Sequence, residues 1–101
     1  MKPDRRAAIF PGSFDPFTLG HMDVLRSALK LFDKIYIAVG YNHLKHGFLP
    51  PQTRVALIQD AVRPLIESGA DIEVLSYTGL TVNLCREKNT GFIIRGLRTT
   101  T

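Results

Sequence analysis

The chain has few of the features that mark secreted, disulfide-stabilised or membrane proteins. It holds a single cysteine, Cys85, so no intrachain disulfide can form and nothing indicates an oxidising compartment. No apolar run approaches the roughly 20 residues that a membrane-spanning helix needs. Residues 1–6 are polar overall and lack the apolar stretch of a secretory signal, so no signal is expected. We therefore expect no membrane partner.

A strong excess of one charge is also missing. The formal net charge is +4, and the Lys and Arg residues are spread along the chain rather than clustered. Without a basic patch or an aromatic–basic stripe, nucleic acid is not expected as a partner. A content of 45% hydrophobic and 22% charged residues is typical of a globular protein. Because the chain shows no repeat or low-complexity linker, residues 1–101 are predicted to form one domain.

Apolar residues follow two alternating patterns along the chain. Runs of β-branched and aromatic residues predict buried strands, whereas apolar residues spaced three and four apart predict amphipathic helices. The predicted strands are residues 7–10, 34–40, 71–75 and 91–95, and the predicted helices are residues 20–32, 51–66 and 81–88. Strands and helices that alternate with short connections predict an α/β fold built on a parallel sheet.

The segment between the first strand and the first helix, residues 11–21, is the most informative part of the sequence. A strand, a glycine-containing turn and a helix start leave backbone N–H groups unpaired, and the helix dipole favours an anion there. An anion site needs no imidazole, so His21 at the start of the helix indicates chemistry. In a parallel sheet this segment, the loop 41–50 and residues 95–98 should meet at the carboxyl edge, where ligands bind.

Two short motifs resemble those of a known family. They read GSFDPFTLGH at residues 12–21 and IRGLR at residues 94–98. With both motifs, the chain resembles the bacterial phosphopantetheine adenylyltransferases, members of the nucleotidyltransferase superfamily with a Thr/His-x-Gly-His signature. The resemblance implies a Rossmann-like nucleotidyltransferase fold with helices on both faces of the sheet. It also implies an enzyme that transfers AMP from ATP to 4′-phosphopantetheine, giving dephospho-coenzyme A and pyrophosphate in coenzyme A biosynthesis.

On the ATP side, the resemblance implies roles for individual residues. Ser13 corresponds to a hydroxyl residue that contacts both substrates, and Phe14 is expected to contact ATP through its backbone. His21 is expected to contact the ATP phosphates and to stabilise the transition state. The remaining contacts with the nucleotide fall on Gly96, Leu97 and Arg98.

On the acceptor side, the resemblance implies that Lys45 and Arg95 contact the phosphate of 4′-phosphopantetheine and take part in catalysis. Thr81 lies where the backbone of the family holds the pantetheine arm. Mg²⁺ is expected to arrive with ATP, and no side chain is expected to act as a metal ligand. The resemblance further implies a cytoplasmic hexamer. Catalysis of this kind rests on positioning and electrostatics, so it requires no Ser or Cys nucleophile.

Other interpretations stay open. Another adenylyl- or cytidylyltransferase of the superfamily, acting on nicotinamide mononucleotide or glycerol phosphate, is one alternative. The family continues well beyond the position of Thr101, so its C-terminal part is expected to be absent here, and a non-catalytic nucleotide-binding fragment is a second alternative. At single positions, Ser13 can be a turn hydroxyl and Lys45 a solvated side chain. Arg95 and Arg98, three residues apart, can form surface ion pairs.

Overall fold

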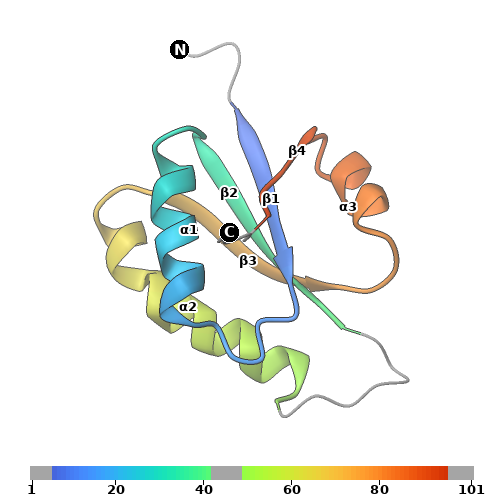
Figure 1. The fold of residues 1–101 in the computed structure, drawn as a ribbon, viewed down its shortest axis with the longest axis horizontal. Coiled ribbons are helices and arrows are strands. Elements are labelled where there is room, and N and C mark those ends of the chain that lie inside the picture. The colour runs from blue at the N-terminus through green and yellow to red at the C-terminus, as the bar shows by residue number, and fades with distance from the viewer. Residues whose placement is uncertain (1–5, 42–48, 96–101) are drawn as a thin grey trace, which may run out of the picture.

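Four parallel strands form one sheet in a computed structural model that describes residues 6–41 and 49–95 (Figure 1). The strands are β1 (Ala7–Gly12), β2 (Lys34–Gly40), β3 (Asp71–Tyr77) and β4 (Phe92–Ile93). They lie in the order β3-β2-β1-β4, and every neighbouring pair is parallel. The predicted α/β fold with a parallel sheet is therefore confirmed.

The two faces of the sheet carry separate apolar clusters, because successive side chains of a strand point to opposite sides. One cluster joins even-numbered residues of β1 and odd-numbered residues of β2 to Leu25 of α1 (Leu19–Leu29) and Ile58 of α2 (Pro51–Glu67). The other cluster joins Ile9 and Ala38 to Leu84 and Cys85 of α3 (Thr81–Glu87). Helices thus cover both faces, as expected, with α3 on the side opposite α1 and α2 (Figure 1).

The first helix ends three residues before its predicted end at residue 32. The amides of Leu31 and Phe32 both donate to the carbonyl of Ala28, so the chain tightens into a turn after Leu29. Asp33 then exchanges hydrogen bonds with the backbone of Arg6, which lines β2 up beside β1. The helical spacing of Leu29 and Phe32 caused the error, because Phe32 packs on the core from the turn instead.

Strand lengths differ from the prediction at three places. β1 and β3 are each two residues longer than predicted, because both continue to pair with β2 up to its last residues. β4 is shorter, with two residues in place of the predicted 91–95, because this edge strand pairs only with Ala8 and Ile9 of β1. The second and third helices match their predictions to within one residue at each end.

The strand order defines where a ligand can approach. β2 and β3 lie on one side of β1, and β4 lies on the other side. The direction of the chain across the sheet therefore reverses between β1 and β4, and the crevice at such a point, beyond the carboxyl ends of the strands, is the usual ligand site of open α/β sheets. The segment 13–18 leaves β1 at this edge, and Arg95 follows β4 there.

Candidate functional site

A buried phenylalanine anchors the loop that leaves β1. Phe14 has a positive φ of 48° and is only 3% exposed, with its ring edge-on to Phe10 at 5.2 Å between centroids. A Cβ on Gly12 would lie 3.0 Å from the Phe14 ring, so a larger residue at this position would press on the ring. Because the Phe14 side chain is taken up by the core, only its backbone can face a ligand.

His21 lies in the first turn of α1, as the sequence predicted. Thr18 is the N-cap residue, and its hydroxyl accepts a hydrogen bond from the His21 amide at 3.3 Å. In return the Thr18 amide donates to Nδ1 of His21 at 2.8 Å, and the Thr18 Oγ1 lies 3.0 Å from the same nitrogen. This reciprocal pair is a capping box in which histidine occupies the place usually taken by Glu or Gln.

Three aromatic rings surround the imidazole of His21. Phe17 stacks on it with centroids 5.4 Å apart, Phe14 meets it edge-on at 4.9 Å, and Phe10 lies at 6.2 Å. Partial burial among these rings lowers the pKa of His21 below its ordinary value of 6.5, because desolvation disfavours the charged form. The ring is therefore held as a neutral imidazole near pH 7.

A buried arginine ties this loop to the second helix. Arg54 of α2 is 6% exposed, and its guanidinium donates to the carbonyls of Ser13 at 2.7 Å and Leu49 at 2.9 Å. Sequence reasoning did not single out Arg54 as a site residue. The signal was available, because Arg54 stands four residues before Ile58 and eight before Val62, on the buried stripe of the helix. A cation on such a stripe indicates a specific partner.

Arg95 lies at the same edge of the sheet as the His21 loop. The amide of Ile94 donates to the carbonyl of Ile9 at 2.8 Å, so the chain leaves β4 alongside the end of β1. Arg95 follows directly and is exposed. The structure thus places both His21 and Arg95 at the edge where the strand order reverses, next to the end of β1.

The remaining site candidates fall into two groups. Ser13 is exposed in the loop after β1, and Thr81 begins α3, where its Oγ1 lies 2.8 Å from the hydroxyl of Tyr77. The predicted residues Lys45, Gly96, Leu97 and Arg98 lie outside the described residues. The expected meeting of three segments at the carboxyl edge is therefore seen for two of them, residues 11–21 and the start of 95–98.

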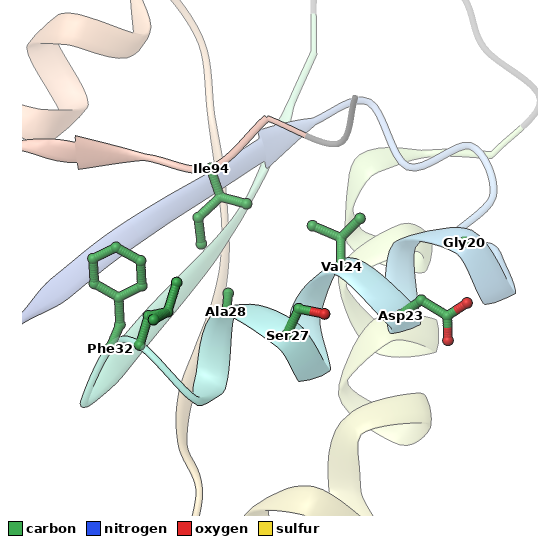
Figure 2. A pocket seen from close by; sticks show the side chains of 8 residues that line it. Gly20, Asp23, Val24, Ser27, Ala28, Phe32 and Ile94 are labelled. Atoms are coloured by element: carbon green, nitrogen blue, oxygen red, sulfur yellow. The ribbon is translucent and has the colours of Figure 1, made fainter. Parts of the chain in front are cut away.

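A cavity of about 450 Å³ opens between α1 and the chain that follows β4 (Figure 2). Ile94 points into it from the end of β4 toward α1. The cavity is mostly apolar, and the residues that line it are Gly20, Asp23, Val24, Ser27, Ala28, Leu31, Phe32 and Ile94. Because Gly20 precedes His21 in the first turn of α1, the cavity adjoins the anion-favouring helix start.

No group of three or more His, Cys, Asp or Glu side chains is placed to hold a metal within residues 6–41 and 49–95. This donor set fits a Mg²⁺ ion only where phosphate oxygens and water supply most of its ligands, which is how Mg²⁺ is commonly bound with nucleotides. In the same residues, no helix is both long enough and apolar enough to cross a membrane.

Comparison with known proteins relates residues 9–101 to one family model, described as cytidylyltransferase-like. The chain is 42% identical over 93 residues to the phosphopantetheine adenylyltransferase of Christiangramia forsetii, covering 92% of this chain and 59% of that protein. It is 44% identical over 94 residues to the enzyme of the same name from Leptospira biflexa, covering 93% and 56%. The chain therefore spans less than two thirds of the length of these curated relatives.

Proposed function

The chain belongs to the cytidylyltransferase-like family, and on that basis we propose that it forms the nucleotide-binding part of an enzyme that transfers AMP from ATP to 4′-phosphopantetheine. One observation carries this proposal. The first turn of α1 presents a neutral imidazole, His21, at the point of the sheet where nucleotides bind in such folds. The relatives named phosphopantetheine adenylyltransferase supply the two substrates of the proposal.

The proposed reaction joins two phosphates without a protein nucleophile. An oxygen of the 4′-phosphate of phosphopantetheine attacks the α-phosphorus of ATP, and the bond from that phosphorus to the oxygen bridging to the β-phosphate breaks. The electron pair leaves with pyrophosphate, and dephospho-coenzyme A remains. Negative charge grows on the non-bridging oxygens of the α-phosphate in the transition state. Catalysis therefore depends on positioning the two substrates and on hydrogen-bond donors aimed at those oxygens.

The residues at the carboxyl edge supply such donors. His21 is proposed to donate to the ATP phosphates from the start of α1, where the backbone N–H groups and the helix dipole add to the field. Ser13 and the backbone of Phe14 are proposed to hold ATP beside it. Arg54 keeps this loop in place through the Ser13 carbonyl, because a charged hydrogen bond of 2.7 Å fixes the backbone there.

The acceptor is proposed to lie across the β1 end from His21. Arg95, with Lys45 from the loop after β2, is proposed to bind its phosphate, and the backbone at Thr81 is proposed to hold the pantetheine arm. Gly96, Leu97 and Arg98 are proposed to complete the nucleotide site. The cavity between α1 and Ile94 supports this division, because it offers an apolar space beside the phosphate-binding turn for the rest of a nucleotide.

Mg²⁺ is proposed to enter with ATP, shielding the phosphate charge, while the chain itself provides the orientation. We also propose the cytoplasmic location and the hexamer that the resemblance implies. A different nucleotidyltransferase reaction is the second candidate, because the matching family model is named for cytidylyl transfer.

A panel of substrates in the natural-length protein separates these candidates. Pyrophosphate release is measured with ATP or CTP against 4′-phosphopantetheine, nicotinamide mononucleotide and glycerol phosphate. We expect release with ATP and 4′-phosphopantetheine in preference to every other pair. Preference for CTP or for another acceptor would overturn the proposed substrates.

A further inference from the structure

The hydrogen bonds of His21 determine which of its ring nitrogens is free. Nδ1 lies 2.8 Å from the amide nitrogen of Thr18, and that N–H group can only donate. Nδ1 must therefore be an unprotonated acceptor. The hydroxyl of Thr18, 3.0 Å from Nδ1, fits the same assignment, because its oxygen accepts from the His21 amide while its proton turns toward the ring.

We propose that Thr18 is a positioning residue that fixes the His21 tautomer with its proton on Nε2, so that the ring meets the nucleotide as a neutral hydrogen-bond donor. The assignment of the tautomer stands on the geometry of the free protein. Its consequence for catalysis rests on the proposed function.

The cap and the surrounding rings act in the same direction. A proton on Nδ1 would face the Thr18 N–H group at 2.8 Å, so the doubly protonated ring loses the hydrogen bond and meets a donor instead. Phe14 and Phe17 pack against the ring and shield part of it from solvent, which further disfavours a positive charge. His21 therefore stabilises growing phosphate charge through Nε2–H without giving up a proton.

The choice of residue type supports a role beyond capping. A capping box usually has Glu or Gln at the third helical position, where the side chain accepts from the N-cap amide. Histidine makes the same bond here through Nδ1 and still has a donor on its second nitrogen. A carboxylate at position 21 would cap the helix equally well, but it would repel a bound phosphate. The motif thus combines helix capping with anion recognition in one side chain.

The first experiment reads the tautomer directly in the natural-length protein without nucleotide. Long-range proton–nitrogen NMR spectra of the ¹⁵N-labelled protein assign each ring nitrogen of His21, and a scalar coupling across the hydrogen bond links Nδ1 to the Thr18 amide nitrogen. We expect a single tautomer protonated at Nε2, together with that coupling. A proton on Nδ1, or averaging between two tautomers, would overturn the proposal whatever reaction the protein catalyses.

The second experiment asks whether the cap matters for turnover. Thr18→Val removes the hydroxyl, Thr18→Ser restores it, and Ile58→Val in the α2 core is the control for lost stability alone. We expect Thr18→Val to lower kcat about tenfold with little change in the KM for ATP, and to weaken the coupling between Nδ1 and the backbone amide of residue 18, because the hydroxyl that caps the first turn of α1 is lost. Thr18→Ser should recover both within about twofold.

The results separate this inference from the proposed function. If Thr18→Val loses no more turnover than Ile58→Val, Thr18 is only a helix cap and its positioning role is overturned. If the natural-length protein transfers no AMP but shows the Nε2–H tautomer, the proposed reaction fails while the tautomer assignment stands. In that case the NMR resonance of the His21 Nε2–H group serves as the readout. If adding ATP shifts this resonance in the parent but not in Thr18→Val, the positioning role is supported. Equal shifts in the two proteins would oppose it.

Discussion

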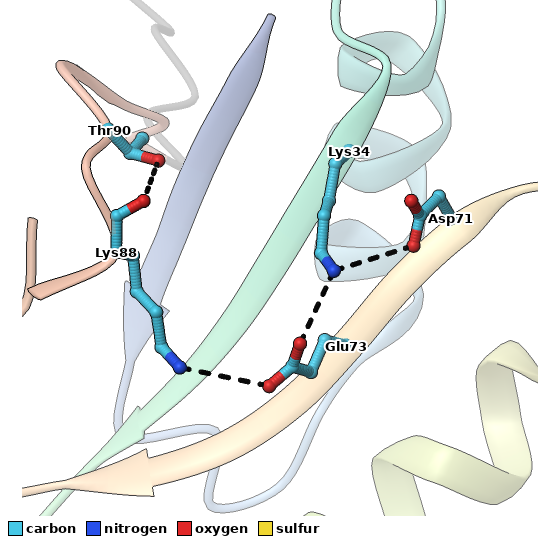
Figure 3. A network of polar contacts seen from close by, with 5 residues as sticks. All are labelled: Lys34, Asp71, Glu73, Lys88 and Thr90. Carbon is cyan, nitrogen blue, oxygen red and sulfur yellow. Dashed lines mark hydrogen bonds and ion pairs between the residues drawn. The ribbon is translucent and has the colours of Figure 1, made fainter. Parts of the chain in front are cut away.

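The two edges of the sheet handle charge in opposite ways. At the amino edge, Lys34 bridges Asp71 at 3.7 Å and Glu73 at 3.3 Å, and Lys88 reaches the other Glu73 oxygen at 3.9 Å (Figure 3). At the carboxyl edge, the guanidinium of Arg54 is bound to two backbone carbonyls, and Arg95 is exposed. Carboxylates neutralise Lys34 and Lys88 at the first edge, whereas backbone carbonyls bind Arg54 at the second.

This difference indicates where an anion can bind. Two neighbouring carboxylates offset the positive potential of a lysine, so the lysine attracts an anionic ligand only weakly, and the carboxylates themselves would repel phosphate. A guanidinium bound to neutral carbonyls keeps its full charge and sits behind the loop that carries Ser13. The start of α1, which favours an anion, lies at the same edge. The molecule thus has lysines paired with carboxylates at one end of the strands and an arginine bound to backbone carbonyls at the other.

Removing the imidazole of His21 should have the largest effect. We expect His21→Ala to lower kcat by about 10²–10³, because one donor to developing charge is worth that much, while the affinity for ATP changes much less. Pyrophosphate release and ATP binding are measured side by side in the natural-length protein. Lys88→Met at the amino edge is the matched control and should leave kcat unchanged. Equal losses in turnover and ATP binding for His21→Ala would mean that the residue serves ground-state binding only.

Removing the guanidinium of Arg54 should have the next largest effect, and this effect should be on the stability of the fold. Arg54→Met leaves the carbonyls of Ser13 and Leu49 without their donor, so we expect a loss of about 2–3 kcal/mol in the free energy of unfolding. The control is Arg63→Met on the same helix, where an exposed pair with Asp60 at 2.7 Å should matter by about 0.5 kcal/mol or less. Urea unfolding measures both variants, and similar losses would contradict the distinction between the two arginines.

The pH dependence of stability should reveal the partly buried imidazole of His21. The folded state lowers the pKa of His21, so the unfolded chain binds more protons as the pH falls below about 6.5. Stability should therefore decrease as the pH falls from 6.5 toward the lower folded pKa, and level off below it. His21→Gln removes this contribution, and the difference between the two urea-unfolding curves from pH 7.5 to 5 isolates it. A difference that grows in the opposite direction would show that the fold favours the charged ring.

Sequence patterns predicted the fold more fully than the site. The strands around Ile9 and Ile37 were found because buried strands are continuous apolar runs, and the alternation of elements gave the parallel sheet. The end of α1 was placed too late, since the periodic spacing of Phe32 does not distinguish a helix from a turn that packs on the same core. β4 was predicted too long, because the sequence does not show how far an edge strand pairs.

At the site, the positions of His21 and Arg95 followed from local motifs and strand order. Arg54 and Thr18 did not, because their importance comes from contacts with carbonyls and a ring nitrogen that become visible only when the chain is folded. Arg54 contacts a residue 41 positions earlier. Sequence spacing carries no information about such a pair, although an arginine on a buried helix stripe already signals that a partner exists.

The network at the amino edge should give the smallest effect, and a test of it sharpens the contrast between the edges. Partial burial lowers the pKa of Lys34, but its hydrogen bond to Glu73 and the charges of Tyr36, Asp71 and Glu73 outweigh this, so the pKa is raised overall from 10.5. The stabilisation by Lys34 is therefore complete below pH 10.5 and is lost as the pH rises through the higher folded pKa.

Lys34→Met should lower the free energy of unfolding at pH 7 by less than about 1 kcal/mol, because the pairs are partly exposed and screened by salt. In the parent protein, the ammonium of Lys34 lies over the Tyr36 ring, 4.9 Å from its centroid. The methionine side chain of the variant is long enough to cover the same ring. The difference from the parent should shrink in 1 M NaCl and as the pH rises above 10.5, and kcat should not change. Urea unfolding at two salt concentrations and two pH values measures it, and a fall in turnover would show that the two edges are coupled rather than separate.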